Sequence, residues 1–334
     1  MIGIAVIGCG RIGRMHAENV ARNPRARLAM VYDVHGPAAQ DTAVALGAIN
    51  ASGAEEIFAS PEVDGVLIAS STDTHVDMIV AAARAGKVAL CEKPIDLDIT
   101  RVEKCRKEIE GTDARILLGF NRRFDPTHAA LRAGIAAGRI GEPELVIISS
   151  RDPGLPPLDY LKRSGGLFRD MTIHDFDMAR FLLNEEPIEV FATASNRVDS
   201  LVREIGDFDT AMVVMKTAKG ALIHINNSRR AVYGYDQRVE VFGAEGMLRS
   251  DNPRETALVY DCAEATDSRT PLHEFFIERY PESYLREIDH FVDVIEEKAE
   301  PSVTFEDGRK ALILADAAVK SLQSGRAVSV RNDV

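Results

Sequence analysis

Residues 2–13 read IGIAVIGCGRIG, an apolar run followed by a glycine-rich turn. The apolar run is rich in isoleucine and valine, which is typical of a buried strand in a parallel sheet. The turn has the GxGxxG spacing, in which glycines permit a sharp bend, close approach of a pyrophosphate and close packing of the following helix. The free N–H groups at the start of that helix then face the phosphates. The sequence therefore predicts a dinucleotide site that includes Gly8, Gly10, Arg11, Ile12 and Gly13.

A second signal supports the glycine-rich turn, which on its own is weak evidence. Another apolar run, residues 28–32, ends in Asp33, which lies 20 residues beyond Gly13. An acid at this distance hydrogen-bonds the ribose hydroxyls of NAD. No Arg or Lys occurs at 34–36 to bind the 2′-phosphate of NADP, so we predict NAD as the preferred cofactor. The alternative for Asp33 is an acid that merely ends a strand.

Strands and helices alternate through the first third of the chain. Apolar strand patterns cover 65–69, 88–91 and 116–120, with helical patterns at 74–85 and 100–110. This alternation predicts a doubly wound parallel sheet, whose ligands bind beyond the carboxyl ends of the strands. The polar residues expected on that cofactor side are Ser70, Ser71, Thr72, Glu92 and Lys93, together with His75, for which helix capping is the alternative.

The pattern changes after Gly141-Glu142-Pro143. Strands are predicted with few helices between them, at 145–150, 189–196, 210–216, 221–227 and 238–242. We expect a largely antiparallel, open sheet with helices on one face, and a C-terminal helix over 305–323 that returns to the first domain. The predicted domains are 1–121, 122–300 and 301–334. Because an uncovered apolar sheet face is normally buried by a partner, we also expect a homo-oligomer.

Residues 165–183, GGLFRDMTIHDFDMARFLL, carry the strongest candidate for chemistry. On a helix, Asp170, His174 and Asp177 lie on one face because they are spaced by four and three residues. The apolar residues Leu167, Met171, Met178 and Leu182 give the same helix a buried stripe. An imidazole beside a carboxylate is suited to act as a general base on an alcohol. A weak surface pair and a metal site remain as alternatives.

Lys93 is a second candidate for chemistry. It follows a buried strand at its ligand end and precedes Pro94, which holds residue 93 extended. A cation fixed there could polarise a substrate oxygen. The alternative is an ordinary solvated lysine.

Composition limits the classes of partner. The chain has 334 residues, 46% hydrophobic and 28% charged, with a net charge of -12, which argues against binding to nucleic acid or anionic membranes. No apolar run is long enough to span a membrane, and the N-terminus has no export-signal pattern. The four cysteines are scattered and form no CxxC pair, which favours reduced thiols and a cytoplasmic location.

Four motifs together resemble those of the Gfo/Idh/MocA oxidoreductases. They are GCGRIG at 8–13, ASSTDTH at 69–75, CEKPI at 91–95 and FNRRFD at 120–125. The segment SGGLFRDMTIHDFDMARFL at 164–182 is most similar to that of bacterial inositol 2-dehydrogenases. The resemblance covers essentially the whole chain. One departure is Ser70-Ser71, where a version containing proline is commoner in the family.

The resemblance implies a Rossmann domain joined to an α/β domain whose open sheet mediates assembly, often as tetramers. It also implies a catalytic set of Lys93, Asp170 and His174, and no metal. By the same resemblance Arg122 belongs to the cofactor site. The expected substrate contacts are Lys93, Arg123, Asp152, Asp170, His174, Asp177 and Tyr235.

The expected activity is NAD-dependent oxidation of a cyclic polyol, with myo-inositol giving 2-keto-myo-inositol. A dehydrogenase of scyllo-inositol or of an aldose is the nearest alternative. A non-catalytic NAD-binding regulator and a metal-dependent hydrolase built on Asp170, His174 and Asp177 belong to other classes. NADH formation across a panel of inositols and sugars distinguishes the dehydrogenases from the regulator, and sensitivity to chelators would indicate the hydrolase.

Overall fold

A computed structural model describes residues 1–330, which form two compact units. The N-terminal unit consists of residues 1–124 and 282–312, and the C-terminal unit of residues 125–281 and the chain from 313 onward. The boundaries expected from the sequence, after 121 and after 300, divide the chain differently. The difference arises because the helix α11 (Pro281–Ile295) buries its apolar side in the N-terminal unit.

The N-terminal unit contains a six-stranded sheet in the order β3-β2-β1-β4-β5-β6, with every pairing parallel. This confirms the doubly wound parallel sheet. The register brings Ile7 level with Tyr32 and Ile68, and Ile68 level with Cys91. The carboxyl ends of these strands therefore lie in one row. The strands are β1 (Ile2–Ile7), β2 (Ala26–Tyr32), β3 (Ile49–Asn50), β4 (Gly65–Ile68), β5 (Val88–Cys91) and β6 (Ile116–Leu118).

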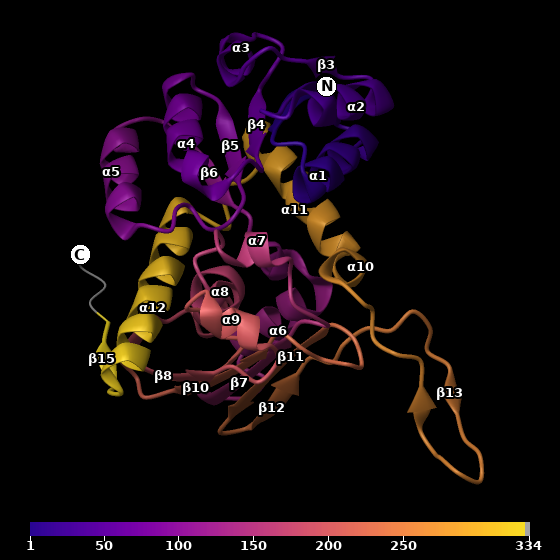
Figure 1. The fold of residues 1–334 in the computed structure, drawn as a ribbon, viewed down its shortest axis with the longest axis vertical. Helices are drawn as coiled ribbons and strands as arrows, with labels where there is room; N and C mark the ends of the chain where they lie inside the picture. The colour runs from indigo at the N-terminus through magenta and orange to yellow at the C-terminus, as the bar shows by residue number, and fades with distance from the viewer. Residues whose placement is uncertain (331–334) are drawn as a thin grey trace. The chain divides into compact units, whose positions relative to one another are not determined.

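Helices cover both faces of this sheet (Figure 1). On one face α1, α2 and α11 share a core with the strands, in which Ala17, Ala39 and Phe291 are almost fully buried. Helices α4 and α5 pack against each other on the other face. The helices are α1 (Arg11–Arg22), α2 (Gly36–Leu46), α3 (Ala54–Ala59), α4 (His75–Arg84) and α5 (Ile99–Ile109), with 3₁₀ turns at Thr72–Thr74 and Asn121–Phe124.

The C-terminal unit is built on a seven-stranded sheet in the order β12-β11-β7-β10-β9-β8-β15. Only the β7–β10 pair is parallel, which confirms a mostly antiparallel sheet. The strands are β7 (Pro143–Arg151), β8 (Pro187–Ser195), β9 (Thr210–Thr217), β10 (Leu222–Ser228), β11 (Asp236–Gly243), β12 (Gly246–Arg249) and β15 (Val328–Ser329).

Among residues 1–330, helices cover one face of this sheet and leave the other uncovered. The covered face shares a core with α6, α8 and the later part of α12 (Figure 1), which confirms helices on one face. The sequence instead predicts that the helix over 305–323 returns to the first domain. Residues of α12 up to Leu312 group with the N-terminal unit, and the rest group with the C-terminal unit. The helices are α6 (Pro126–Ala136), α7 (Leu158–Leu161), α8 (Ile173–Leu183), α9 (Ser200–Glu204), α10 (Phe276–Arg279) and α12 (Phe305–Ser324).

A ribbon formed by β13 (Val259–Tyr260) and β14 (Ser268–Arg269) projects from the rest of the C-terminal unit (Figure 1). It exposes the apolar side chains of Leu258, Val259 and Tyr260. Among residues 1–330, no helix is both long enough and apolar enough to cross a membrane.

A buried ion pair joins two distant segments of the C-terminal unit. Arg279 donates to Asp125 across 2.8 Å, and the two side chains are 3% and 4% exposed. The other oxygen of Asp125 accepts from the amides of Thr127 and His128 and so caps α6. Burial alone would raise the pKa of Asp125, but the charges of His128 and Arg279 and their hydrogen bonds lower it.

We predict that Arg279→Met lowers the free energy of unfolding by about 3–5 kcal/mol, because it leaves a buried carboxylate without its cation. Urea denaturation would measure the loss. The double variant Arg279→Met/Asp125→Asn should recover part of it, since an amide can still cap α6 without carrying a charge. A single variant as stable as the wild type would show that the pair contributes nothing.

Candidate active site

The glycine-rich turn lies between β1 and α1, and each glycine has a different reason to be there. Gly8 has a φ of 97°, and a Cβ on it would lie 2.4 Å from the carbonyl oxygen of Ala69. A Cβ on Gly13 would lie 1.8 Å from the carbonyl oxygen of Gly8. In contrast, no atom lies within 4 Å of a Cβ placed on Gly10. Gly8 and Gly13 are thus packed tightly against backbone atoms, whereas the space beside Gly10 is free, as binding of a pyrophosphate requires.

Asp33 connects the end of β2 to this turn. Its Oδ2 accepts from the amide of Cys9 at 2.6 Å, and its Oδ1 accepts from the amide of His35 at 2.7 Å. The residue stays half-buried, and the adjoining Val34 is 90% exposed. The carboxylate therefore lies beside the turn and holds it in place.

The other predicted cofactor residues follow β4, β5 and β6. Ser70 is half-buried and its hydroxyl lies 2.7 Å from that of Thr74. Ser71 is exposed and Thr72 is half-buried. His75 is 1% exposed, with one ring nitrogen 2.8 Å from the carbonyl of Pro94 and the other 3.1 Å from that of Ser70. His75 thus joins two loops of the site.

Glu92 and Lys93 follow β5 directly, and both are half-buried. The carboxylate of Glu92 lies 2.7 Å from Nε2 of the buried His16. Of the two arginines after β6, Arg122 is buried, and Arg123 donates to Asp307 at 2.9 Å within the same unit.

In the C-terminal unit, Asp170 and His174 lie on consecutive turns. The helix expected for 165–183 contains a π-helical turn, Phe168–Thr172, which holds Asp170 and runs into α8. π turns of this kind occur frequently at functional sites. The predicted apolar stripe is confirmed, since Leu167, Met171, Met178 and Leu182 are all buried. Between 173 and 180 only His174 keeps partial exposure.

Two side chains hold the carboxylate of Asp170, and sequence reasoning missed both. Tyr160 donates to Oδ1 at 2.7 Å, and Arg229 donates to Oδ2 at 2.9 Å. Burial and then the charge of Asp170 raise the pKa of Tyr160. Burial alone would lower the pKa of Arg229, but the carboxylates of Asp170 and Asp152 outweigh it and raise that pKa.

The parallel pairing of β7 and β10 explains how Asp152 joins this group. Arg151 pairs with Ser228 at the carboxyl ends of these strands, so the next residues, Asp152 and Arg229, lie near each other. Their side chains are 3.8 Å apart. A strand-end argument could have found Arg229, whereas the short helix α7 that carries Tyr160 has no periodicity that would mark it.

Two predicted substrate residues are more buried than their role requires. Asp177 is 1% exposed and its carboxylate lies 3.6 Å from Arg180. Tyr235 is 6% exposed, and its ring meets that of Tyr280 edge-on, with centroids 6.1 Å apart. Both residues belong to the C-terminal unit, as do Asp152, Asp170 and His174, whereas Lys93 and Arg123 belong to the N-terminal unit.

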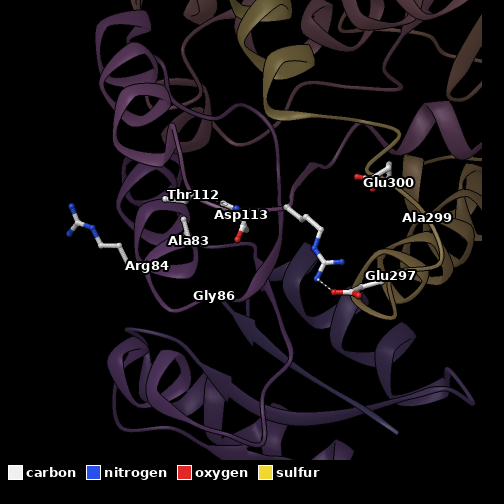
Figure 2. Close-up of a pocket in the computed structure, with 10 residues that line it drawn as sticks. Ala83, Arg84, Gly86, Thr112, Asp113, Glu297, Ala299 and Glu300 are labelled. Carbon is white, nitrogen blue, oxygen red and sulfur yellow. Dashed lines mark hydrogen bonds and ion pairs between the residues drawn. The ribbon is translucent and has the colours of Figure 1, made fainter.

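A solvent-open hollow of about 930 Å³ lies elsewhere in the N-terminal unit (Figure 2). Its lining includes Gly86 and Arg115, which precede β5 and β6, and Arg115 pairs with Glu297 at 3.4 Å. The hollow is therefore at the amino ends of the strands. Because nucleotides bind at the carboxyl ends of such sheets, it is not the cofactor site.

Comparisons with known proteins agree with these observations. Two Gfo/Idh/MocA family models match: "Oxidoreductase family, NAD-binding Rossmann fold" over residues 2–120, and "Oxidoreductase family, C-terminal alpha/beta domain" over residues 132–330. The N-terminal unit is thus an NAD-binding Rossmann domain. Inositol 2-dehydrogenase of Rhizobium meliloti (strain 1021) is 49% identical over 329 residues, which cover 98% of this chain and 99% of the relative.

Two solved structures show the same fold along the full chain. Myo-inositol dehydrogenase from Corynebacterium glutamicum is 46% identical, with a TM-score of 0.95 and 99% of each chain covered. Scyllo-inositol dehydrogenase from Lactobacillus casei, solved with bound NAD(H) and scyllo-inositol, is 29% identical, with a TM-score of 0.92 and 99% of each chain covered.

We predict that Asp33→Ala weakens NAD binding about 10- to 100-fold, which corresponds to the loss of a hydrogen bond to a charged group. The same variant should have a smaller preference for NAD over NADP. NADH fluorescence titration would measure both effects. Asp33→Asn is the matched control, because it keeps an acceptor for the Cys9 amide but lacks the charge. Tighter binding of NADP than of NAD by the unmodified protein would contradict the role given to Asp33.

Proposed function

Because this chain belongs to the Gfo/Idh/MocA oxidoreductase family, we propose that it oxidises an inositol, foremost myo-inositol to 2-keto-myo-inositol. The observation that carries the proposal is the charged group around Asp170, with the partly exposed His174 on the next turn. The full-length similarity to inositol dehydrogenases supports the choice of substrate class.

The reaction removes a hydride from the carbon that bears the hydroxyl and a proton from its oxygen. NAD, when bound, supplies the hydride acceptor. His174 accepts the proton, and the charge of Asp170 stabilises the resulting imidazolium. Tyr160 and Arg229 hold the Asp170 carboxylate in one orientation. Lys93 stabilises the negative charge that develops on the substrate oxygen.

Recognition of a cyclic polyol needs several donors and acceptors. In this proposal Arg123, Asp152, Asp177 and Tyr235 contribute contacts to the ring hydroxyls. Asp152 has the strongest structural support, because it is half-buried and lies beside the same arginine as Asp170. The burial of Asp177 against Arg180 favours an indirect contribution from that residue.

The first test is NADH formation with a panel of myo-inositol, scyllo-inositol and aldoses. Fastest oxidation of myo-inositol is expected. A preference for scyllo-inositol or an aldose would move the enzyme to a related specificity. An absence of NADH with every polyol would favour a non-catalytic regulator.

If His174 is the base, we predict that His174→Ala lowers kcat about 10²–10⁴-fold and leaves NADH affinity almost unchanged. In the wild type, kcat/KM for oxidation should rise with pH as the imidazole loses its proton, and this pH-dependent rise should be absent from His174→Ala. Asp170→Asn and Lys93→Ala should also lower the rate, but Lys93→Ala should keep the pH-dependent rise.

His290→Ala is the matched control for His174→Ala, because His290 is also a half-buried histidine but lies on α11 in the N-terminal unit. It should retain the wild-type rate. A His174→Ala enzyme within a few fold of wild type would end the assignment of the base. Loss of the wild-type rate in chelators would instead favour a metal site.

We also propose that the enzyme is a homo-oligomer, foremost a tetramer, and cytoplasmic. All four cysteines are free, which fits a reducing compartment. The uncovered face of the C-terminal sheet supports the assembly, because adjacent strands align Leu222, Leu145, Phe242 and Met247 in one row and Phe191, Val214, His224 and Ile147 in the next. The apolar side chains of these rows are each 39% to 45% exposed, with Met212 beside them 55% exposed.

A second copy of this chain fits such a face, since a two-fold axis would place apolar rows against apolar rows. We predict that Val214→Arg shifts the sedimentation profile to smaller species, because each interface would then bury unpaired charges. Val232→Arg is the control, since Val232 is 91% exposed and outside the sheet. A wild-type monomer at micromolar concentration would contradict the proposal.

A further inference from the structure

Glu287 of α11 is a buried acid that the proposed reaction does not use. Its side chain belongs to a residue with 0% exposure, and neither carboxyl oxygen has a hydrogen-bond partner among the described residues. An ionised carboxylate in such a place would be very costly. Burial, and then the charge of Glu92, raise the pKa of Glu287 well above its usual range. Burial without a hydrogen-bond partner therefore favours the protonated, neutral form of Glu287.

The residues around Glu287 lie close to Glu92, the residue before Lys93. Glu92 lies 2.7 Å from Nε2 of His16, a residue of α1 with 0% exposure. A Cβ on Gly119 would lie 2.8 Å from the other oxygen of Glu92, so this carboxyl group rests against the end of β6. The ring of His16 meets Tyr284 of α11 edge-on, with centroids 5.5 Å apart.

The helix α11 is fixed to the same place by a second contact. The hydroxyl of Ser283 donates to the carbonyl of Asn121, directly after β6. The titratable groups recorded around Glu287 are thus Glu92 from the end of β5, His16 from α1 and Tyr284 from its own helix. Tyr284, which contacts His16, lies one helical turn before Glu287, so Glu287 lies on the side of α11 that faces His16 and Glu92. The side chain of Glu92 is only 17% exposed.

We propose that Glu92 and Glu287 hold one proton between them, and that this carboxyl pair and His16 position Glu92 and, through the chain, Lys93. Two neighbouring buried carboxyl groups do not both ionise, so one keeps its proton over a wide pH range. Glu287 is the one that keeps it, because it is fully buried and Glu92 is paired with His16. Glu287 and His16 are positioning residues, and this role rests on the proposed function of Lys93.

The pair has a consequence at alkaline pH. Loss of the proton from Glu287 would leave two carboxylates that repel each other, since the charge of Glu92 acts on Glu287. Their repulsion would displace Glu92, which follows β5 on the cofactor side and adjoins Lys93. Both NADH affinity and the oxidation rate should therefore fall as Glu287 ionises.

Glu287→Gln is the informative variant, because an amide has the shape of the protonated acid and cannot ionise. The unfolded wild-type chain releases this proton above about pH 4.5, whereas the native chain keeps it, so wild-type stability falls as pH rises from there. The variant should match the wild type near pH 4.5 and melt several degrees higher at about pH 8. Its NADH affinity and its rate should persist to higher pH than those of the wild type.

Glu282→Gln is the matched control, because Glu282 lies on the same helix, is exposed and pairs only with Arg286 among the recorded ion pairs. Its melting temperature should not diverge from that of the wild type as the pH rises. The infrared spectrum adds a direct readout: the carbonyl stretch of a buried protonated carboxyl should be present in the wild type and Glu282→Gln, and absent from Glu287→Gln.

His16 gives the test of positioning. His16→Gln keeps a donor for Glu92 and should retain kcat within a few fold, whereas His16→Leu should lower kcat about tenfold or more. Equal losses of kcat in His16→Gln and His16→Leu would contradict the positioning role. So would a fall in rate at alkaline pH that occurs at the same pH in Glu287→Gln as in the wild type.

The claim that Glu287 keeps a proton would be wrong if two results came together. The difference in melting temperature between Glu287→Gln and the wild type would be independent of pH, and the wild type would lack the infrared band of a buried protonated carboxyl group. The melting, infrared and NADH readouts need no polyol. If no polyol is oxidised, the proposed function fails while these readouts still decide whether the pair exists.

Discussion

The alignment of strand ends in the Rossmann sheet is the constraint on which the rest of the N-terminal unit depends. Because β1, β2, β4 and β5 end level with one another, the glycine-rich turn, Asp33, Ser70 and Glu92 emerge at one edge. Hydrogen bonds then join these loops: Asp33 holds the turn, and His75 joins the loops after β4 and β5. The strand register thus brings residues from some 85 positions of sequence to one edge, and a few side-chain hydrogen bonds then fix the loops.

In the C-terminal unit the corresponding constraint is electrostatic. Arg229 is almost fully buried, and its charge is balanced by Asp170 and Asp152. A buried guanidinium is tolerated only where carboxylates satisfy it, so the three residues stabilise one another's positions. Tyr160 completes the group by donating to Asp170. Asp170 lies in the π-helical turn and contacts these partners, whereas the α8 helix that follows is buried along most of its length.

Local pattern predicted most of the fold, because strand ends, glycine spacing and apolar stripes are encoded by residues close in sequence. The sheet of each unit, the turn at Gly8–Gly13 and the buried stripe around His174 were accessible in this way. What escaped prediction depends on distant segments. Tyr160 has no periodic context, Glu287 looks like any acid on an amphipathic helix, and the π-helical turn changes a spacing that the sequence presents as regular. The membership of α11 in the N-terminal unit likewise follows from the match of its apolar side to a sheet built more than 160 residues earlier.

The late arrival of α11 affects how the chain folds during synthesis. Residues 1–124 leave the ribosome first, but the core beneath Leu28, Val31 and Ala43 is closed only when Phe291 and Val292 have been made. At about 5–20 residues per second, the intervening segment takes roughly ten to thirty seconds to translate. Through that interval the sheet face that carries α1 and α2 still lacks α11, so part of its apolar surface stays uncovered. Residues 125–281 of the C-terminal unit are therefore made before the core of the N-terminal unit can close.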